Sequence, residues 1–169
     1  MIVVVGIGLW STRSSGPSTV PVGKKAPAFS LASSTGGTVS LSDYAGTNLL
    51  LYFNEGVGCD ACFYQTAELE KRQAEFDEAG VSMAAIVVNP LDQIRPVLDR
   101  FGIATPYLID EGADVSKAYG MLGKGMHADL PGHGFVLIDG TGQIRWEREY
   151  PSMYASAGEI LSQIRPFLD

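Results

Sequence analysis

The chain has only two cysteines, Cys59 and Cys62, and they stand two residues apart between two contrasting segments. Residues 49–53 form an unbroken apolar run that predicts a buried strand, and residues 63–79 show the periodicity of an amphipathic helix. A Cys-x-x-Cys pair at a strand-to-helix turn is typical of dithiol redox chemistry. This pair constrains the fold most, because such a turn requires a sheet on one side and a helix on the other.

The position of Cys59 at a helix N-terminus favours its thiolate form. The first backbone N–H groups of a helix have no helical partner, and the helix dipole places partial positive charge there. Thiolate is the attacking form in disulfide exchange, although the neighbouring Asp60 opposes ionisation. Cys62, Leu69 and Phe76 recur every seven residues and should share the buried helix face. We therefore expect Cys59 to face outward as the attacking thiol and Cys62 to lie inward as the resolving thiol.

The cysteine pair has two other interpretations, a structural disulfide and a metal site. A disulfide that closes so short a loop restrains the unfolded chain little, because loop-closure entropy grows with loop length. A zinc site built from thiolates needs a second cysteine pair or suitably spaced histidines, and the sequence contains neither. Redox chemistry is therefore the favoured interpretation.

Composition indicates one globular domain. The chain has 169 residues, of which 46% are hydrophobic, enough for an ample core. Its net charge of -7 and its lack of a basic cluster argue against nucleic acid and anionic membrane surfaces as partners. We see no glycine loop of the kind that cradles phosphates, and we expect no cofactor.

The N-terminal segment differs from the rest of the chain. Residues 1–10 are nearly all apolar, and residues 11–21 are rich in Ser, Thr, Gly and Pro. The apolar run is too short to span a bilayer and lacks the basic start of a secretory signal. We interpret it as the remnant of a membrane anchor followed by a flexible linker, with the domain at residues 22–169. A membrane-tethered, extracytoplasmic domain is favoured over a cytoplasmic protein with a disordered or locally packed N-terminus.

Strands and helices are expected to alternate along the domain. Predicted strands lie at residues 29–31, 39–41, 49–53, 81–88, 107–109, 135–138 and 143–149, the last two forming a hairpin. Predicted helices lie at residues 63–79, 94–101 and 114–119, with Pro96 expected to kink or delay the second of them. Ser156 and Glu159 form a capping-box pattern before a closing helix. The fold class is therefore α/β.

The order strand, Cys-x-x-Cys, helix, strand, helix, hairpin, helix resembles the thioredoxin fold. Residues 22–31 with 39–44, residues 107–120 and residues 135–139 resemble the peroxiredoxin branch, the alkyl hydroperoxide reductase and thiol-specific antioxidant family. The resemblance covers about residues 22 to 168. It implies a thioredoxin-like fold, with a central mixed β-sheet flanked by helices and an N-terminal β-hairpin extension.

The chain departs from that family at the cysteine loop. Peroxiredoxins resemble one another in a Pro-x-x-x-Thr-x-x-Cys loop, and Glu55, Cys59 and Cys62 stand at its proline, threonine and cysteine positions. The missing proline and threonine shape the peroxide pocket in the family, which argues against efficient peroxide reduction. The thioredoxin-like pattern makes Cys59 the nucleophile, although this chain has one more residue between strand and cysteine.

Two further residues are candidates for the catalytic site. His133 stands where the resemblance implies a cis-proline or an arginine, in a loop that lies against the cysteine turn. It could hold a thiolate as an imidazolium or pass a proton, and the alternative is a loop histidine that faces solvent. Glu55 could take the proton from Cys62 during resolution, and the alternative is a surface carboxylate.

The sequence therefore predicts a peroxiredoxin-like thiol-disulfide oxidoreductase with an antioxidant, redox-homeostasis role. Its expected partners are a protein or small-molecule disulfide or a peroxide as substrate, and a thiol as electron donor. The second candidate is a copper-binding assembly protein that uses Cys59, Cys62 and His133, since thiolates and one imidazole suit copper.

Overall fold

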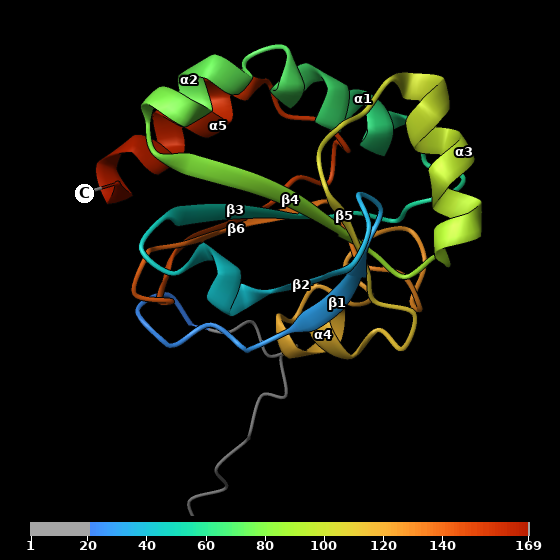
Figure 1. Cartoon of the computed structure of the whole chain (residues 1–169), viewed down its shortest axis with the longest axis horizontal. Coiled ribbons are helices and arrows are strands. Elements are labelled where there is room, and N and C mark those ends of the chain that lie inside the picture. Colours follow the sequence, from blue (N-terminus) through green and yellow to red (C-terminus); the bar gives the residue numbers. More distant parts are fainter. Residues whose placement is uncertain (1–20, 169) are drawn as a thin grey trace, which may run out of the picture.

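The computed structural model describes residues 21–168, which form one seven-stranded mixed sheet with helices on both faces (Figure 1). The strands are β1 (Ser30–Ser33), β2 (Thr38–Ser40), β3 (Asn48–Phe53), β4 (Val81–Val87), β5 (Tyr107–Ile109), β6 (Gly134–Ile138) and β7 (Ile144–Glu149). The helices are α1 (Asp60–Glu70), α2 (Gln73–Glu78), α3 (Leu91–Phe101), α4 (Asp114–Ala118) and α5 (Ala157–Ile164), with 3-10 turns η1 (Leu41–Tyr44) and η2 (Arg165–Phe167). The predicted α/β class is confirmed.

The sheet has the order β2-β1-β5-β4-β3-β6-β7. β3 runs parallel to β4, and β4 runs parallel to β5, whereas the other neighbouring strands are antiparallel. β1 and β2 form the predicted N-terminal hairpin, and β6 and β7 form the predicted late hairpin. The expected central mixed sheet with a hairpin extension is therefore confirmed.

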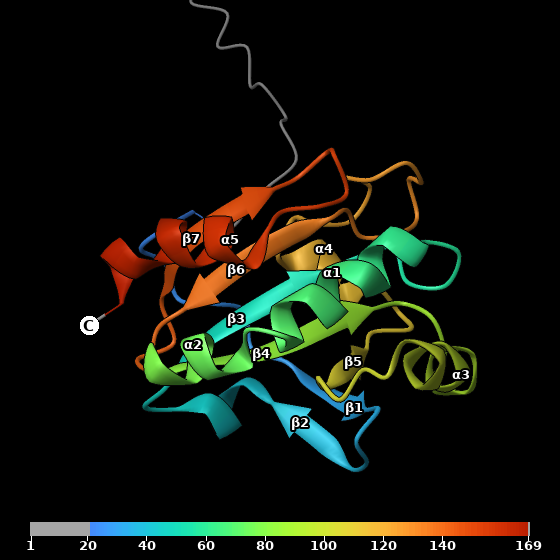
Figure 2. The ribbon, with the colours of Figure 1, turned by 90° about the horizontal axis from the view of Figure 1, so that it is seen from above.

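β3 is buried on both faces, as its unbroken apolar run predicts. Leu50 and Tyr52 contribute to a core with α1, α2, α3 and α5, whereas Leu49, Leu51 and Phe53 contribute to a core with α4 and the N-terminal hairpin. Each of the five side chains is at most 3% exposed. Figure 2 shows α5, α1 and α2 lying across one face of the sheet. Burial of each large apolar side chain contributes roughly 1.5–3 kcal/mol, so the strand that leads to the cysteines is firmly held.

The prediction of one long helix over residues 63–79 is wrong in one respect, because the structure has two helices there, α1 and α2. Arg72 leaves the helical region, with φ -115° and ψ 20°, and its N–H bonds to Leu69 O. The predicted buried stripe nevertheless holds across the break, since Cys62, Leu69 and Phe76 are 0%, 3% and 0% exposed. Lys71, which caps the C-terminal end of α1, pairs with Glu68, three residues earlier in the chain.

Pro96 does not delay the next helix. α3 begins at Leu91, five residues before the proline, and ends at Gly102, whose left-handed φ of 66° suits a residue without a side chain. Before the last helix, Ser156 Oγ accepts the Glu159 N–H at 3.1 Å, so the Ser156 half of the predicted capping box is confirmed. Glu159 Oε1 instead accepts from Gln163 Nε2 at 3.0 Å.

The predicted membrane-anchor remnant at residues 1–10, and all but the last residue of the predicted linker at 11–21, lie outside the described residues. Within residues 21–168, no helix has both the length and the apolar character needed to span a bilayer. The expectation of a tethered, extracytoplasmic domain therefore stays a prediction.

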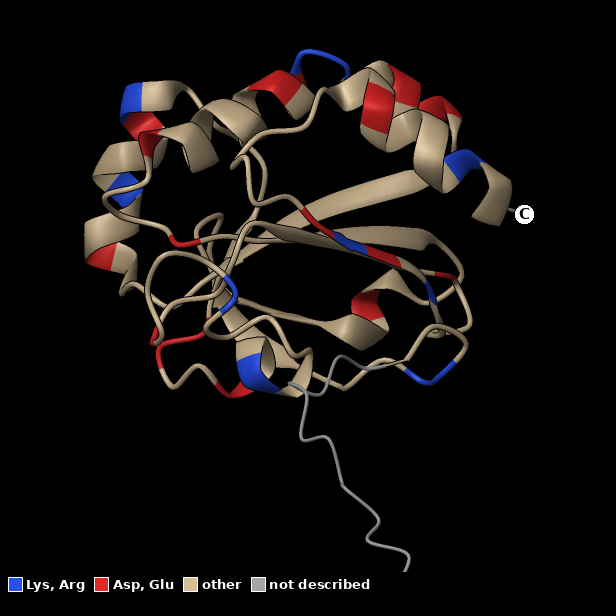
Figure 3. Ribbon diagram, turned by 180° about the vertical axis from the view of Figure 1, so that it is seen from behind, with Lys and Arg blue, Asp and Glu red and all other residues tan. Residues whose placement is uncertain are grey.

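Charged side chains are distributed over many elements. Figure 3, which shows the ribbon from behind, has the Lys and Arg positions spread over separate elements. Acidic residues are frequent on α2, which carries Glu75, Asp77 and Glu78. The expected absence of polyanionic partners stays a prediction.

Candidate active site

The two cysteines form a disulfide at the N-terminus of α1. Their Cα atoms are 5.4 Å apart, and Cys59 is the N-cap residue of the helix. Cys59 is 9% exposed and Cys62 is 0% exposed. Both cysteines are therefore buried, with Cys59 the more exposed of the two, and the outward, attacking role that the sequence gives Cys59 stays a prediction.

The helix start supplies a donor for the Cys59 sulfur. The backbone N–H of Cys62 donates to Cys59 Sγ over 3.3 Å, and the preceding loop turns through Gly56 and Gly58, with φ of 74° and 101°. In the reduced protein this donor and the helix dipole would stabilise a Cys59 thiolate. Asp60 opposes that charge less than its position suggests, because its carboxylate pairs with Arg100 at 2.5 Å.

His133 lies beside the buried sulfur and not in solvent. Phe53 of β3 pairs with Gly134 of β6, so the residue before β6 reaches the end of β3 from which the cysteine loop departs. His133 is 2% exposed, and its Nδ1 is 4.0 Å from Cys62 Sγ. Burial lowers the pKa of His133 to about 4, so the imidazole is neutral at physiological pH in the disulfide form. Of the two roles that the sequence suggests, this environment favours proton transfer over a standing imidazolium.

A buried polar network, which the sequence interpretation missed, surrounds this histidine. Tyr52 OH lies 2.9 Å from His133 Nδ1 and 3.4 Å from Cys62 O. Thr66 Oγ1 also approaches Cys62 O, at 3.4 Å, and bonds Tyr107 OH at 2.7 Å. The sequence does contain a sign of this network. Thr66 follows Cys62 by one helical turn, so it is a polar side chain on the buried face of the helix and needs a hydrogen-bond partner.

Glu55 is buried, but its carboxylate forms no hydrogen bond with either sulfur. It is 3% exposed, its Oε1 accepts the Met126 N–H at 2.6 Å, and its Oε2 lies 3.4 Å from His127 Nδ1. A side chain on Gly125 would bring Cβ within 2.2 Å of Glu55 Oε1, so this loop approaches the carboxylate closely. Its contacts therefore suit an anchor that ties the cysteine loop to residues 125–127.

Substitution of Glu55 distinguishes a role as an anchor of the cysteine loop from a role as the proton acceptor for Cys62. Glu55→Ala leaves the Met126 N–H without its acceptor, and we expect the free energy of unfolding to fall by about 2 kcal/mol. Glu55→Gln retains an acceptor oxygen and should cost less in urea denaturation of the oxidised protein. If Glu55 takes the proton from Cys62, both variants should instead slow disulfide reduction equally, because glutamine cannot accept that proton.

A small hollow opens beside His133. It has a volume of about 170 Å³ and is lined by Lys124, Gly125, Met126, His133, Glu149, Tyr150, Pro151 and Met153. Lys124 Nζ and Glu149 Oε1 pair at 2.7 Å in its wall. The hollow therefore lies directly beside the histidine.

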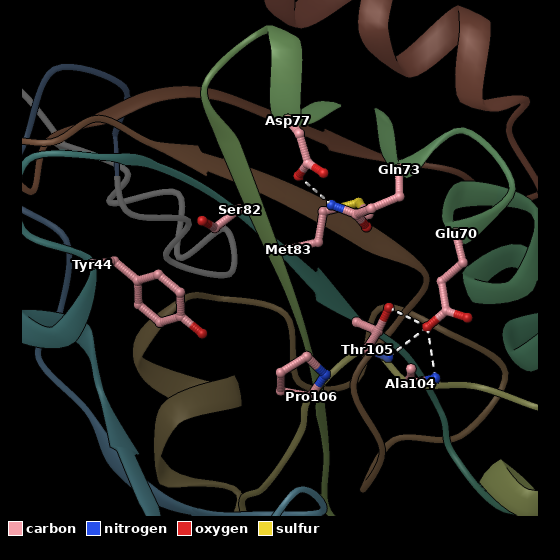
Figure 4. Close-up of a pocket in the computed structure, with 9 residues that line it drawn as sticks. All are labelled: Tyr44, Glu70, Gln73, Asp77, Ser82, Met83, Ala104, Thr105 and Pro106. Atoms are coloured by element: carbon pink, nitrogen blue, oxygen red, sulfur yellow. Dashed lines mark hydrogen bonds between the residues drawn. The ribbon is translucent and has the colours of Figure 1, made fainter. Parts of the chain in front are cut away.

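A larger hollow of about 580 Å³ lies elsewhere, near the C-terminal end of α1 (Figure 4). Glu70 lines it, but Glu70 Oε1 already accepts hydrogen bonds from Ala104 N, Thr105 N and Thr105 Oγ1. None of the predicted site residues lines this hollow, so size alone does not locate the chemistry.

Support for the copper-binding alternative is absent from the part of the chain that the structure describes. Residues 21–168 contain no group of three or more His, Cys, Asp or Glu side chains placed to hold a metal ion. His133 Nδ1, the atom nearest Cys62 Sγ, also lies in hydrogen-bonding range of Tyr52 OH.

The sequence model of the AhpC/TSA family matches residues 22–147 of the 169-residue chain. The chain belongs to the AhpC/TSA family. Thiol-disulfide oxidoreductase ResA of Halalkalibacterium halodurans is 30% identical over 120 residues, covering 70% of this chain and 68% of ResA. A Mycobacterium tuberculosis protein whose name places it provisionally among the peroxiredoxins is 30% identical over 102 residues, covering 60% of this chain. The match spans 65% of that relative, slightly less than two thirds of its length.

The family assignment agrees with the fold. The reduced 2-Cys peroxiredoxin of Plasmodium vivax has a TM-score of 0.75 with this structure at 26% sequence identity. The match covers 85% of this chain and 79% of that one. The predicted thioredoxin-like fold of the AhpC/TSA family is therefore confirmed.

Proposed function

We propose that this chain is a thiol-disulfide oxidoreductase in which Cys59 attacks and Cys62 resolves. The observation that carries the proposal is the Cys59–Cys62 disulfide at the start of α1, in which Cys59 is the more exposed of the two cysteines. A buried partner sulfur already within bonding reach is suited to intramolecular resolution. The relative named as thiol-disulfide oxidoreductase ResA supports the same chemistry.

The reaction transfers two electrons from the dithiol to a substrate disulfide. The Cys59 thiolate attacks one substrate sulfur, the substrate S–S bond breaks, and the departing thiolate takes a proton from solvent. Cys62 then loses its proton and attacks Cys59 Sγ, so that the intramolecular disulfide forms and the second substrate thiol is released. An external thiol donor reduces the disulfide again. The structure corresponds to the oxidised product of this cycle.

In this scheme, His133 is the proton acceptor for Cys62. Its Nδ1 is 4.0 Å from Cys62 Sγ, and neutral imidazole can take up a proton at that atom. The imidazolium formed next to a thiolate is stabilised by the opposite charge, and it can pass the proton to the second substrate thiolate as that thiolate leaves Cys59. Glu55 has no comparable contact, so we assign it no step.

Disulfide exchange is favoured over peroxide reduction by the environment of Cys62. Cys62 occupies the position of the peroxide-reducing cysteine in the family pattern, yet it is 0% exposed in the oxidised protein. Glu55 and Cys59 stand where that pattern has proline and threonine. Peroxide reduction by the pair, through sulfenic acid at one cysteine and condensation with the other, is the alternative that the peroxiredoxin relatives support.

Two assays on the wild-type protein test the proposal. We expect catalytic amounts to speed the reduction of insulin by dithiothreitol about tenfold, because a thiolate at a helix N-terminus reacts faster than the free reagent. Hydrogen peroxide should be consumed no faster than by a small-molecule thiol. Protein that has been reduced and alkylated at both cysteines is the control. Rapid peroxide consumption without insulin reduction would establish the alternative, and activity in neither assay would refute both.

A further inference from the structure

The two ring nitrogens of His133 share Tyr52 but differ in their other partners. Tyr52 OH is 2.9 Å from Nδ1 and 3.4 Å from Nε2. Nε2 is also 3.3 Å from Gln65 Oε1, whereas Nδ1 is 4.0 Å from Cys62 Sγ. His133 is 2% exposed, and Gln65 is 0% exposed. Water therefore has little access to the ring, and these side chains decide which nitrogen carries the proton.

The orientation of the Gln65 amide is fixed by Ala155, ninety residues along the chain. The Ala155 N–H donates to Gln65 Oε1 at 2.7 Å, and Gln65 Nε2 donates to Ala155 O at 2.8 Å. A flipped amide would place two donors together and two acceptors together, and both bonds would be lost. The atom that faces His133 is therefore an acceptor, and His133 Nε2 must be the donor.

The opposite side of the ring is compatible with this assignment. Burial raises the pKa of Tyr52 well above its ordinary value, so its hydroxyl keeps its proton and can donate to His133 Nδ1. Tyr52 OH also lies 3.4 Å from Cys62 O. When Cys62 is a thiol, Tyr52 can donate to that carbonyl oxygen and leave Nδ1 open to the sulfhydryl proton.

We infer that Gln65 is a positioning residue that holds His133 as the Nε2–H tautomer, so that the Nδ1 lone pair faces Cys62. The catalytic part of this inference rests on the proposed function. Gln65 follows Cys62 by three residues on α1, and its partner Ala155 lies just before α5. The Gln65 amide thus connects α1, which carries Cys62, with the loop that carries His133 and with the segment just before α5. With the other tautomer, Nδ1 would carry a hydrogen and could not accept the proton of Cys62.

The tautomer of His133 can be read directly from the ¹⁵N shifts of its ring in the oxidised protein, since protonated and lone-pair nitrogens differ strongly. We expect the Nε2–H tautomer in the wild type and a mixture, or mainly Nδ1–H, in Gln65→Met, which has similar length but no acceptor oxygen. Gln65→Glu retains an acceptor and should retain Nε2–H. Gln73→Met is the matched control, because Gln73 bonds Asp77 on α2 and does not contact the histidine.

The second readout is the resolving step, measured as decay of a mixed disulfide formed on Cys59. We expect Gln65→Met to slow this decay about tenfold, because part of the population has the wrong tautomer, and Gln73→Met to leave it unchanged. Retention of Nε2–H in Gln65→Met, or Nδ1–H in the wild type, would overturn the inference. If Gln65→Met is too unstable for spectroscopy, the wild-type and Gln65→Glu spectra still decide between the tautomers. If the wild type shows the expected tautomer but reduces no disulfide, the proposed function is refuted and the assignment of the His133 tautomer stands.

Discussion

Replacing Cys59 by serine will abolish disulfide reduction, whereas replacing Cys62 by serine will trap the substrate on Cys59. Without the attacking thiolate no mixed disulfide forms, so we expect the rate to fall by about 10³-fold or more. Without the resolving thiol, the mixed disulfide forms but has no intramolecular route to products. Insulin reduction will show the first loss, and intact-protein mass under non-reducing conditions will show the trapped adduct.

The asymmetry between the two variants is the decisive feature. Cys59 is 9% exposed and caps α1, whereas Cys62 is fully buried, so only a substrate bonded to Cys59 should accumulate. Tyr64→Phe is a suitable control, because Tyr64 is on the same helix and 62% exposed, and its ring packs against Phe101 of α3. Full activity in both serine variants would refute the dithiol mechanism, and trapping on Cys62 in Cys59→Ser would reverse the roles.

The sequence predicts those parts of the site that depend on local pattern. The apolar run of β3, the helix after the cysteines and the inward position of Cys62 all follow from residues within about four helical turns. The break in that helix at Arg72 does not follow, because both halves keep the same apolar repeat and each still buries its stripe. A periodic pattern specifies which face is buried, and it is insensitive to a short interruption that preserves the face.

The surroundings of the buried sulfur could not be predicted in the same way. His133 is 71 residues from Cys62, and its contact depends on the register between β3 and β6. Counting back from the late strand gave the correct loop, but it could not show that the ring is buried. Gln65 also has its orienting partner at Ala155, far along the chain. Long-range hydrogen bonds of this kind require the packed fold, so sequence indicates the polar residues without their partners.

Acid will destabilise the oxidised protein through His133. In the unfolded chain this histidine titrates near its ordinary pKa of 6.5, whereas in the folded protein burial lowers its pKa to about 4. Between these values the unfolded state binds the proton and the folded state does not, so stability falls as pH falls below 6.5. We expect this residue to account for a loss of about 2 kcal/mol between pH 7 and pH 4.5. Urea unfolding at the two pH values, without reductant, measures the loss.

The chain contains only two histidines, which makes the comparison complete. His133→Gln keeps hydrogen-bonding groups near Tyr52 but cannot titrate, so the difference in stability between the two pH values should shrink by about 2 kcal/mol. His127→Gln is the comparison variant, because it removes the other histidine, whose side chain is 57% exposed. Equal acid losses in wild type and His133→Gln would show that folding does not lower the pKa of this ring. The preference for proton transfer over a standing imidazolium, which rests on the lowered pKa, would then lose its support, even if Cys59 proved to be the attacking thiol.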